Sequence, residues 1–264
     1  MEPPPKATRS NNAPPALPAD ASASDLYLDL MKRALTNSIY PGIEGESFDA
    51  EKRASGADSP PTAHTMIGLR RLDQLQQCVE DVIRSQVPGD VIETGVWRGG
   101  ASIFMRAVLR VHDVTDRTVW VADSFEGLPA ADLEQYPQDD GEVAGLHGIP
   151  YLAVSLEQVK DNFRAYGLLD DQVRFLKGWF KDTLSTAPVE RLAVLRMDGD
   201  MYQSTIEALT ALYPKLSVGG YVVVDDYGAI EQCRQAVHDY RDAHGISDEM
   251  TRVDWTGVHW KRSA

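Results

Sequence analysis

Apolar residues along the chain follow two patterns, short continuous runs and runs at helical spacing. The continuous runs are typical of strands buried on both faces, and they predict strands at 90–94, 118–123, 172–177, 192–198 and 220–225. The stretches between and after them predict helices near 100–112, 155–166, 181–184, 202–214 and 230–243. Strands that alternate with helices favour a parallel sheet covered on both sides, which is the doubly wound α/β class.

The two ends of the chain depart from this alternation. After the last helix, the short segments Thr251–Trp255 and Gly257–Arg262 predict a closing hairpin that places an antiparallel strand in the sheet. Before the first strand, Ser24 is a candidate N-cap for a helix that reaches Leu35. A second helix is expected there from about Leu69 to Ser85.

These patterns divide the chain into three parts. Residues 1–23 are rich in Pro, Ala, Ser and Asn and carry too few large apolar groups to offset the entropy of ordering, so we expect a disordered tail. Residues 24–88 form a helical arm, in which the long polar stretch 41–63 is typical of a lid, an interface arm or disorder. Residues 89–264 carry the α/β domain.

Composition narrows the kinds of partner. The chain has 264 residues, a net charge of −14 and no Lys/Arg-rich block, which argues against nucleic acid and against polyanionic substrates that no metal ion screens. Its two cysteines have no CxxC spacing and are expected to be free thiols. With no signal sequence and no apolar run near the ~20 residues of a membrane span, we expect a cytoplasmic protein without membrane contact.

The first predicted strand leads into a glycine turn. Gly95 follows the strand, and Gly99 and Gly100 open the next helix. A strand, a glycine turn and a helix form a cradle in which backbone N–H groups face a polar or anionic ligand. The spacing is not the GxGxxG of hydride cofactors, and an ordinary strand-to-helix turn is the simpler alternative.

The second and third strands end in residues suited to a nucleoside. Asp123 lies at the end of the second strand, where a carboxylate accepts hydrogen bonds from ribose hydroxyls, although a turn or cap aspartate has the same pattern. After the third strand, Gly178 and Asp182 flank Trp179 and Phe180. This aromatic pair could cover a purine or belong to the core.

Acidic residues follow the fourth and fifth strands. Because parallel strands end at one edge of a sheet, Asp198, Asp225 and Asp226 should converge there, where they repel one another unless a cation lies between them. Oxygen ligands alone favour Mg²⁺. Asp200 lies near this group and could take the proton of a metal-bound hydroxyl, or be a further ligand. His147 and His64 are the competing candidates for the base.

With these residues in place, the chain resembles the macrocin-type sugar O-methyltransferases, which methylate deoxysugar hydroxyls of antibiotics such as tylosin, mycinamicin and novobiocin. The resemblance covers roughly residues 25–264. It is carried by the segments Leu26–Leu30, Ala63–Gly68, Glu93–Gly100, Asp123–Gly127, Leu168–Phe175, Gly178–Leu184, Arg196–Asp200 and Val224–Tyr227.

The resemblance implies a mostly parallel, seven-stranded sheet of the S-adenosylmethionine-dependent methyltransferase type, with an N-terminal helical extension and an antiparallel last strand. It implies that S-adenosylmethionine is bound by Thr65, Met66, Glu93, Thr94, Gly95, Arg98, Gly99, Gly100, Ala101, Asp123, Ser124 and Asp182. It further implies Mg²⁺ on Asp198, Asp225 and Asp226, Asp200 as the base, a small glycoside as substrate, and a homo-oligomer.

Two segments, 130–153 and 41–60, differ from the family where the acceptor is expected to bind. A nucleotide-linked sugar, or a catechol or phenol, is therefore an alternative acceptor for the same chemistry. Outside that chemistry, a nicotinamide-dependent dehydrogenase is disfavoured by the glycine spacing and the acidic cluster. A non-catalytic protein that senses the cofactor is also disfavoured, because it would have no need of the acidic cluster.

Overall fold

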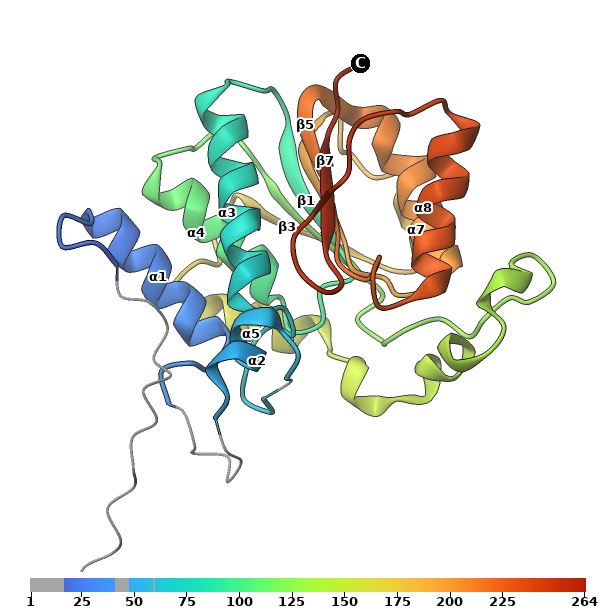
Figure 1. The fold of residues 1–264 in the computed structure, drawn as a ribbon, viewed down its shortest axis with the longest axis horizontal. Helices are drawn as coiled ribbons and strands as arrows, with labels where there is room; N and C mark the ends of the chain where they lie inside the picture. Colours follow the sequence, from blue (N-terminus) through green and yellow to red (C-terminus); the bar gives the residue numbers. More distant parts are fainter. Residues whose placement is uncertain (1–16, 41–47, 59) are drawn as a thin grey trace, which may run out of the picture.

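The computed structural model describes residues 17–40, 48–58 and 60–264. Within these ranges, seven strands form one sheet in the order β3-β2-β1-β4-β5-β7-β6 (Figure 1). The strands are β1 (Asp90–Thr94), β2 (Val119–Asp123), β3 (Val173–Lys177), β4 (Leu192–Met197), β5 (Leu216–Val224), β6 (Thr251–Arg252) and β7 (Val258–Lys261). The first five are parallel, and the predicted doubly wound α/β class is confirmed.

Helices cover both faces of the sheet. One face carries α1 (Ala23–Leu35), α3 (Leu69–Arg84), α4 (Gly100–Val111) and α5 (Leu156–Ala165). The other carries α6 (Phe180–Thr183), α7 (Tyr202–Leu212) and α8 (Glu231–Ala243). Figure 1 shows α3 and α4 on one side of the strands and α7 and α8 on the other. This two-sided cover explains why every residue of β4 is buried, as its continuous apolar run predicts.

The closing hairpin is also confirmed. β7 runs antiparallel to β5, and β6 pairs antiparallel with β7 at the edge of the sheet. β7 is therefore an internal strand although it lies near the end of the chain, and its Trp260 is 1% exposed.

The N-terminal part differs in detail from the prediction. The first helix begins at Ala23, because Ser22 rather than Ser24 is its N-cap and forms a reciprocal capping box with Asp25. The polar stretch 41–63 contains a short helix, α2 (Ala50–Ser55), capped by the side chain of Asp49 and ended by Gly56. Residues 1–16 of the predicted tail lie outside the described residues.

Three short 3₁₀ helices follow β2: η1 (Pro137–Asp139), η2 (Glu142–Gly148) and η3 (Pro150–Leu152). A fourth, η4 (Tyr213–Lys215), leads directly into β5, which starts four residues before its predicted position. In the parts of the chain that the structure describes, no helix has the length and apolar character needed to cross a membrane.

Candidate active site

A cavity lies at the carboxyl ends of β1 to β4. Side chains and backbone from the turns after these strands, from α7 and from the segment before α3 line it, among them Met66, Gly95, Trp97, Asp123, Ser124, Gly178, Trp179, Phe180, Asp198, Asp200, Ser204 and Glu207. Leu128, Pro129 and Leu152 close it on the side of the 3₁₀ helices. The topology therefore brings together residues from six separate stretches of the chain.

Strand register explains how the turn after β1 meets the loop after β4. Thr94 pairs with Met197, so the next residues, Gly95 and Asp198, lie side by side. Gly95 has a φ of 83°, and a Cβ on it would lie 1.7 Å from the backbone oxygen of Asp198. Only glycine fits this conformation and this approach.

The other side of the turn is equally crowded. A Cβ on Gly100 would lie 2.3 Å from the backbone oxygen of His64, so the start of α4 packs directly on the segment 64–65. Arg98 strengthens this contact by donating from Nη1 to the backbone oxygens of Pro61 and Ala63, at 2.5 and 2.7 Å. Arg98 thus holds the segment before α3 in place without lining the cavity itself. Met66, which belongs to the same segment, does line the cavity.

Glu93 and Thr94, the last two residues of β1, are buried. Glu93 lies beside Arg196 across β1 and β4, accepts a hydrogen bond from its Nη1 at 2.6 Å, and also binds the Ser102 hydroxyl. Burial raises the pKa of Glu93 to about 7. The Thr94 hydroxyl is buried, with no partner among the described residues. The structure does not place either side chain on the cavity wall.

Asp123 lines the cavity and also holds its turn. Its Oδ2 accepts a hydrogen bond from the Val96 N–H at 2.7 Å, and its Oδ1 accepts one from the Phe125 N–H at 2.7 Å. Both interpretations of this aspartate, as a turn residue and as a cavity residue, therefore fit its position. Ser124 lies beside it, but Asp182 is exposed and outside the cavity lining.

The acidic residues converge as predicted. Met197 pairs with Val224, so the next residues, Asp198 and Asp225, lie side by side at the ends of β4 and β5. Carboxylate oxygens of Asp198, Asp225 and Asp226 all lie within 4.8 Å of one another, the single group of this kind in the described residues. Burial, with Asp225 nearby, raises the pKa of Asp198 to about 6. Burial and the carboxylate of Asp200 raise the pKa of Asp226 well above its ordinary value.

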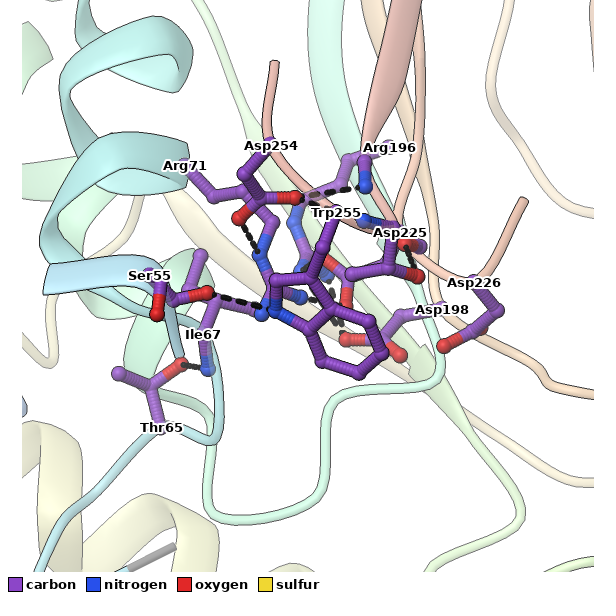
Figure 2. A network of polar contacts seen from close by, with 12 residues as sticks. Ser55, Thr65, Ile67, Arg71, Arg196, Asp198, Asp225, Asp226, Asp254 and Trp255 are labelled. Atoms are coloured by element: carbon purple, nitrogen blue, oxygen red, sulfur yellow. Dashed lines mark hydrogen bonds and ion pairs between the residues drawn. The ribbon is translucent and has the colours of Figure 1, made fainter. Parts of the chain in front are cut away.

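Two buried arginines partly balance this charge (Figure 2). Arg196 of β4 donates to Asp198 Oδ2 at 3.0 Å and to Asp225 Oδ1 at 2.7 Å. Arg71 of α3 donates from Nη1 to Asp225 Oδ2 and from Nε to Asp254 Oδ2 at 2.9 Å. Neither arginine was expected at this site, although a charge inside the apolar run of β4 is a visible signal for Arg196.

The donor set fits a hard divalent cation. All candidate ligands are carboxylate oxygens, and Asp198 Oδ1 and Asp226 Oδ1 receive no hydrogen bond from the residues that the structure describes. Carboxylates outnumber the arginine charges around them, so a cation would lower the repulsion between them. Mg²⁺ is compatible with this site.

The three candidate bases, Asp200, His147 and His64, lie in different environments. Asp200 lines the cavity, has a φ of 57°, and donates its backbone N–H to Asp226 Oδ2 at 3.1 Å. Burial and the nearby Asp198 and Asp225 raise its pKa to about 7. His147 is exposed on η2, outside the cavity lining, and its Nδ1 lies 2.7 Å from the Ala144 backbone oxygen. His64 binds the Tyr166 hydroxyl through Nδ1 at 2.8 Å, outside the same lining.

The segment 130–152 is fixed to the site at two points. Asp139 is fully buried and accepts hydrogen bonds from the N–H groups of Tyr202 and Gln203, at 2.7 and 2.9 Å, at the start of α7. Near the end of the segment, Trp97 donates from Nε1 to the Tyr151 backbone oxygen at 2.9 Å. Because α7 begins just after Asp200, Asp139 connects this segment to the acidic loop.

The sheet order, the antiparallel β7 and the cavity at the strand ends are those of the S-adenosylmethionine-dependent methyltransferase fold. The profile of the family described as Macrocin-O-methyltransferase (TylF) matches residues 41–262. The chain belongs to this family and is an O-methyltransferase.

Three similar proteins support this assignment. The 8-demethyl-8-(2,3-dimethoxy-alpha-L-rhamnosyl)-tetracenomycin-C 4'-O-methyltransferase of Streptomyces olivaceus is 58% identical, over 92% of this chain and 94% of its own. The mycinamicin III 3''-O-methyltransferase of Micromonospora griseorubida is 56% identical, over 91% and 97%. The structure of the O-methyltransferase NovP has a TM-score of 0.87 and 56% identity, over 91% of this chain and all of that one.

Proposed function

We propose that this enzyme methylates a hydroxyl of a deoxysugar attached to an antibiotic-type aglycone, with S-adenosylmethionine as the methyl donor and Mg²⁺ as an essential ion. The carrying observation is that Asp198 and Asp200 lie on the wall of the same cavity as the glycine turn after β1. The two relatives named above support a glycoside acceptor, because both are named for the methylation of a glycosylated natural product or its sugar.

In this proposal each part of the cavity has a separate task. Gly95, Asp123 and the aromatic pair Trp179–Phe180 bind the cofactor, with Met66 above it. Asp198, Asp225 and Asp226 hold the ion. When bound, the cofactor supplies an activated methyl group, and the ion supplies positive charge that lowers the pKa of a sugar hydroxyl.

Asp200 is the proposed base. Burial raises the pKa of its carboxyl group, which makes its carboxylate a stronger proton acceptor than that of an ordinary aspartate. Its backbone N–H donates to Asp226, so Asp200 lies directly beside a proposed ligand of the ion. We assign the role to Asp200 rather than His147 because Asp200 lines the cavity and His147 is exposed outside it.

The test is an assay of the purified enzyme with a panel of acceptors. We expect methylation, detected by mass spectrometry, of a rhamnosylated polyketide or a macrolide glycoside, and none of catechol. A nucleotide-linked deoxysugar in the panel tests whether methylation precedes attachment. EDTA should abolish turnover and excess Mg²⁺ should restore it. Full turnover in EDTA would contradict the role of the ion, and methylation of catechol alone would contradict the sugar acceptor.

We also propose that the enzyme is a homo-oligomer that associates through α1. Leu26 and Leu30 lie one helical turn apart and are 56% and 54% exposed, which is unusual for leucines on a helix that packs on the core with its other face. Light scattering of the full chain should give more than one subunit, and Leu26→Glu with Leu30→Glu should shift it toward the monomer. An unchanged mass in the double variant would contradict this interface.

A further inference from the structure

Arg71 lies on α3, outside the sheet, yet its guanidinium is buried among the carboxylates of the proposed ion site (Figure 2). Its side chain is 7% exposed, and it forms ion pairs with Asp225 of the site and with Asp254 of the C-terminal hairpin. These partners lie 154 and 183 residues away in the sequence. Arg71 thus connects three separate parts of the chain.

The conformation of the C-terminal hairpin accommodates Arg71. Asp254 Oδ1 accepts hydrogen bonds from the N–H groups of Thr256 and Gly257, at 3.0 and 2.8 Å, which leaves Oδ2 to face Arg71. A Cβ on Gly257 would lie 3.0 Å from Arg71 Cδ, so this glycine makes room for the arginine. The Thr256 hydroxyl donates to the backbone oxygen of Asp225 at 2.7 Å. The hairpin and Arg71 therefore hold both the main chain and the side chain of Asp225.

Asp225 is restrained more tightly than the other candidate ligands. Arg71 binds its Oδ2 and Arg196 binds its Oδ1, so both ends of the carboxylate are held. Among the residues that the structure describes, Asp198 is held by Arg196 alone, through one oxygen. Among the same residues, Asp226 accepts one backbone hydrogen bond, also through one oxygen. A carboxylate held at both oxygens has a fixed plane, and this determines which lone pairs face its neighbours.

We propose that Arg71, held by Asp254, is a positioning residue that sets the orientation of Asp225 and thereby the affinity of the site for its divalent ion. The inference rests on the ion site proposed above. It makes ion binding depend on α3 and on the C-terminal hairpin, neither of which supplies a ligand. Partners of metal ligands commonly carry such an effect, and their loss weakens metal binding about 10- to 100-fold.

Charge alone would give the opposite result. A guanidinium repels a cation, so its removal would tighten ion binding if Arg71 acted only through its charge. Orientation should dominate, because without Arg71 the buried carboxylates of Asp225 and Asp254 would face each other with no cation between them. They would move apart, and Asp225 would leave the position in which it faces Asp198 and Asp226.

The experiment measures Mn²⁺ binding to the full chain by electron paramagnetic resonance, with calorimetry of S-adenosylhomocysteine binding as the test of folding. We expect Arg71→Met to weaken Mn²⁺ binding about 10- to 100-fold. Arg71→Lys should recover part of it, because an ammonium group can reach one carboxylate but cannot bridge two. Asp254→Asn, which keeps the contact between Arg71 and Asp225, should cause a smaller loss.

Arg106 provides the matched control. Its side chain is 2% exposed and pairs with Asp170 through two nitrogens, but it lies on α4 outside the cavity lining. Arg106→Met should therefore lower the melting temperature and leave Mn²⁺ affinity unchanged. Mn²⁺ binding to Arg71→Met that equals or exceeds that of the unmodified chain would overturn the inference. If Arg71→Met does not fold, unchanged binding by Asp254→Asn overturns it. A lack of Mn²⁺ binding by the unmodified chain overturns the ion site itself.

Discussion

The turn after β1 and the segment 130–152 border one cavity and are built in opposite ways. In the turn, a Cβ would lie within 3 Å of another part of the chain at each glycine, namely Gly95, Gly99 and Gly100. In the segment, a Cβ would meet nothing within 4 Å at any glycine, namely Gly141, Gly145 and Gly148. The first region is fixed by contact along its length, whereas the second is held by hydrogen bonds at Asp139, in its middle, and at Tyr151, near its end.

This difference suggests how one fold can serve different acceptors. The proposed cofactor and ion sites share backbone contacts, so a change in one disturbs the other. The segment 130–152 can change its length or side chains between its two attachment points without disturbing either site. Substitutions in the two regions should therefore differ widely in their effects.

Asp200→Asn should lower kcat about 10²- to 10⁴-fold, because the proposed base is lost from the crowded side of the cavity. Asparagine tolerates the left-handed backbone at this position, so the loop should keep its shape. The measurement is steady-state kinetics together with calorimetry of S-adenosylhomocysteine, whose affinity should not change. A variant with near-normal kcat would remove Asp200 from the mechanism.

Gly95→Ala should destabilise the protein by about 3 kcal/mol, because its Cβ would strike the backbone oxygen of Asp198 in a left-handed conformation. The matched control is Gly145→Ala, which has open space and should change the free energy of unfolding by less than about 0.5 kcal/mol. Urea unfolding measures both. Equal effects in the two variants would contradict the contrast between the two regions.

Mg²⁺ affinity should rise about tenfold between pH 6 and 7.5. In the metal-free chain, burial raises the pKa of Asp198 to about 6 and that of Asp200 to about 7, from ordinary values near 3.8. The folded chain therefore binds protons that the unfolded chain has released, and this contribution to stability is lost progressively as pH rises from about 4 to 7. Because an ion must displace these protons, its binding strengthens over the same window. Calorimetry at several pH values checks this, and a constant affinity would speak against it.

Asp139→Ala should lower the free energy of unfolding by about 1 kcal/mol, since α7 loses the carboxylate that caps its first N–H groups. The freed segment 130–152 should also raise the KM for the acceptor, with little change in cofactor affinity. Asp139→Asn, which keeps one acceptor oxygen, should show a smaller effect. An unchanged acceptor KM would show that the segment is not held through this contact.

His147→Ala should change kcat less than about twofold and stability by less than about 0.5 kcal/mol, because the ring is exposed and its Nδ1 lies against the backbone of its own turn. This variant is the control for Asp200→Asn, because His147 is the candidate base that belongs to the segment 130–152. A large fall in kcat with normal cofactor binding would return His147 to the mechanism, and would require this segment to close over the acceptor.

Local patterns in the sequence were enough to predict the parallel strands of the sheet and the convergence of the acidic residues. Continuous apolar runs mark the five parallel strands, and strand ends in a parallel sheet share one edge, so Asp198, Asp225 and Asp226 meet. The sequence also predicted the glycine turn, but not the reason why position 95 requires glycine. Its need for glycine comes from the backbone of Asp198, which the register of β1 on β4 brings alongside.

Other parts could not be predicted, for two physical reasons. Some elements are too short to show a period: α2 has six residues, and only its caps, Asp49 and Gly56, could have indicated it. Other features depend on pairs far apart in the chain, such as Arg71 with Asp254 or Asp139 with Tyr202. Charged residues in helices and turns usually face solvent, so nothing local distinguishes a buried pair.

The pair between Arg71 and Asp254 also has a consequence for the order of folding. Contacts across long stretches of chain carry the largest closure entropy and tend to form late, after the local structure on either side. This pair joins a helix that precedes β1 to a turn that precedes β7, so it can close only when the sheet between them exists. We therefore expect a refolding chain to acquire its helices and parallel strands first and its capacity to bind a divalent ion last.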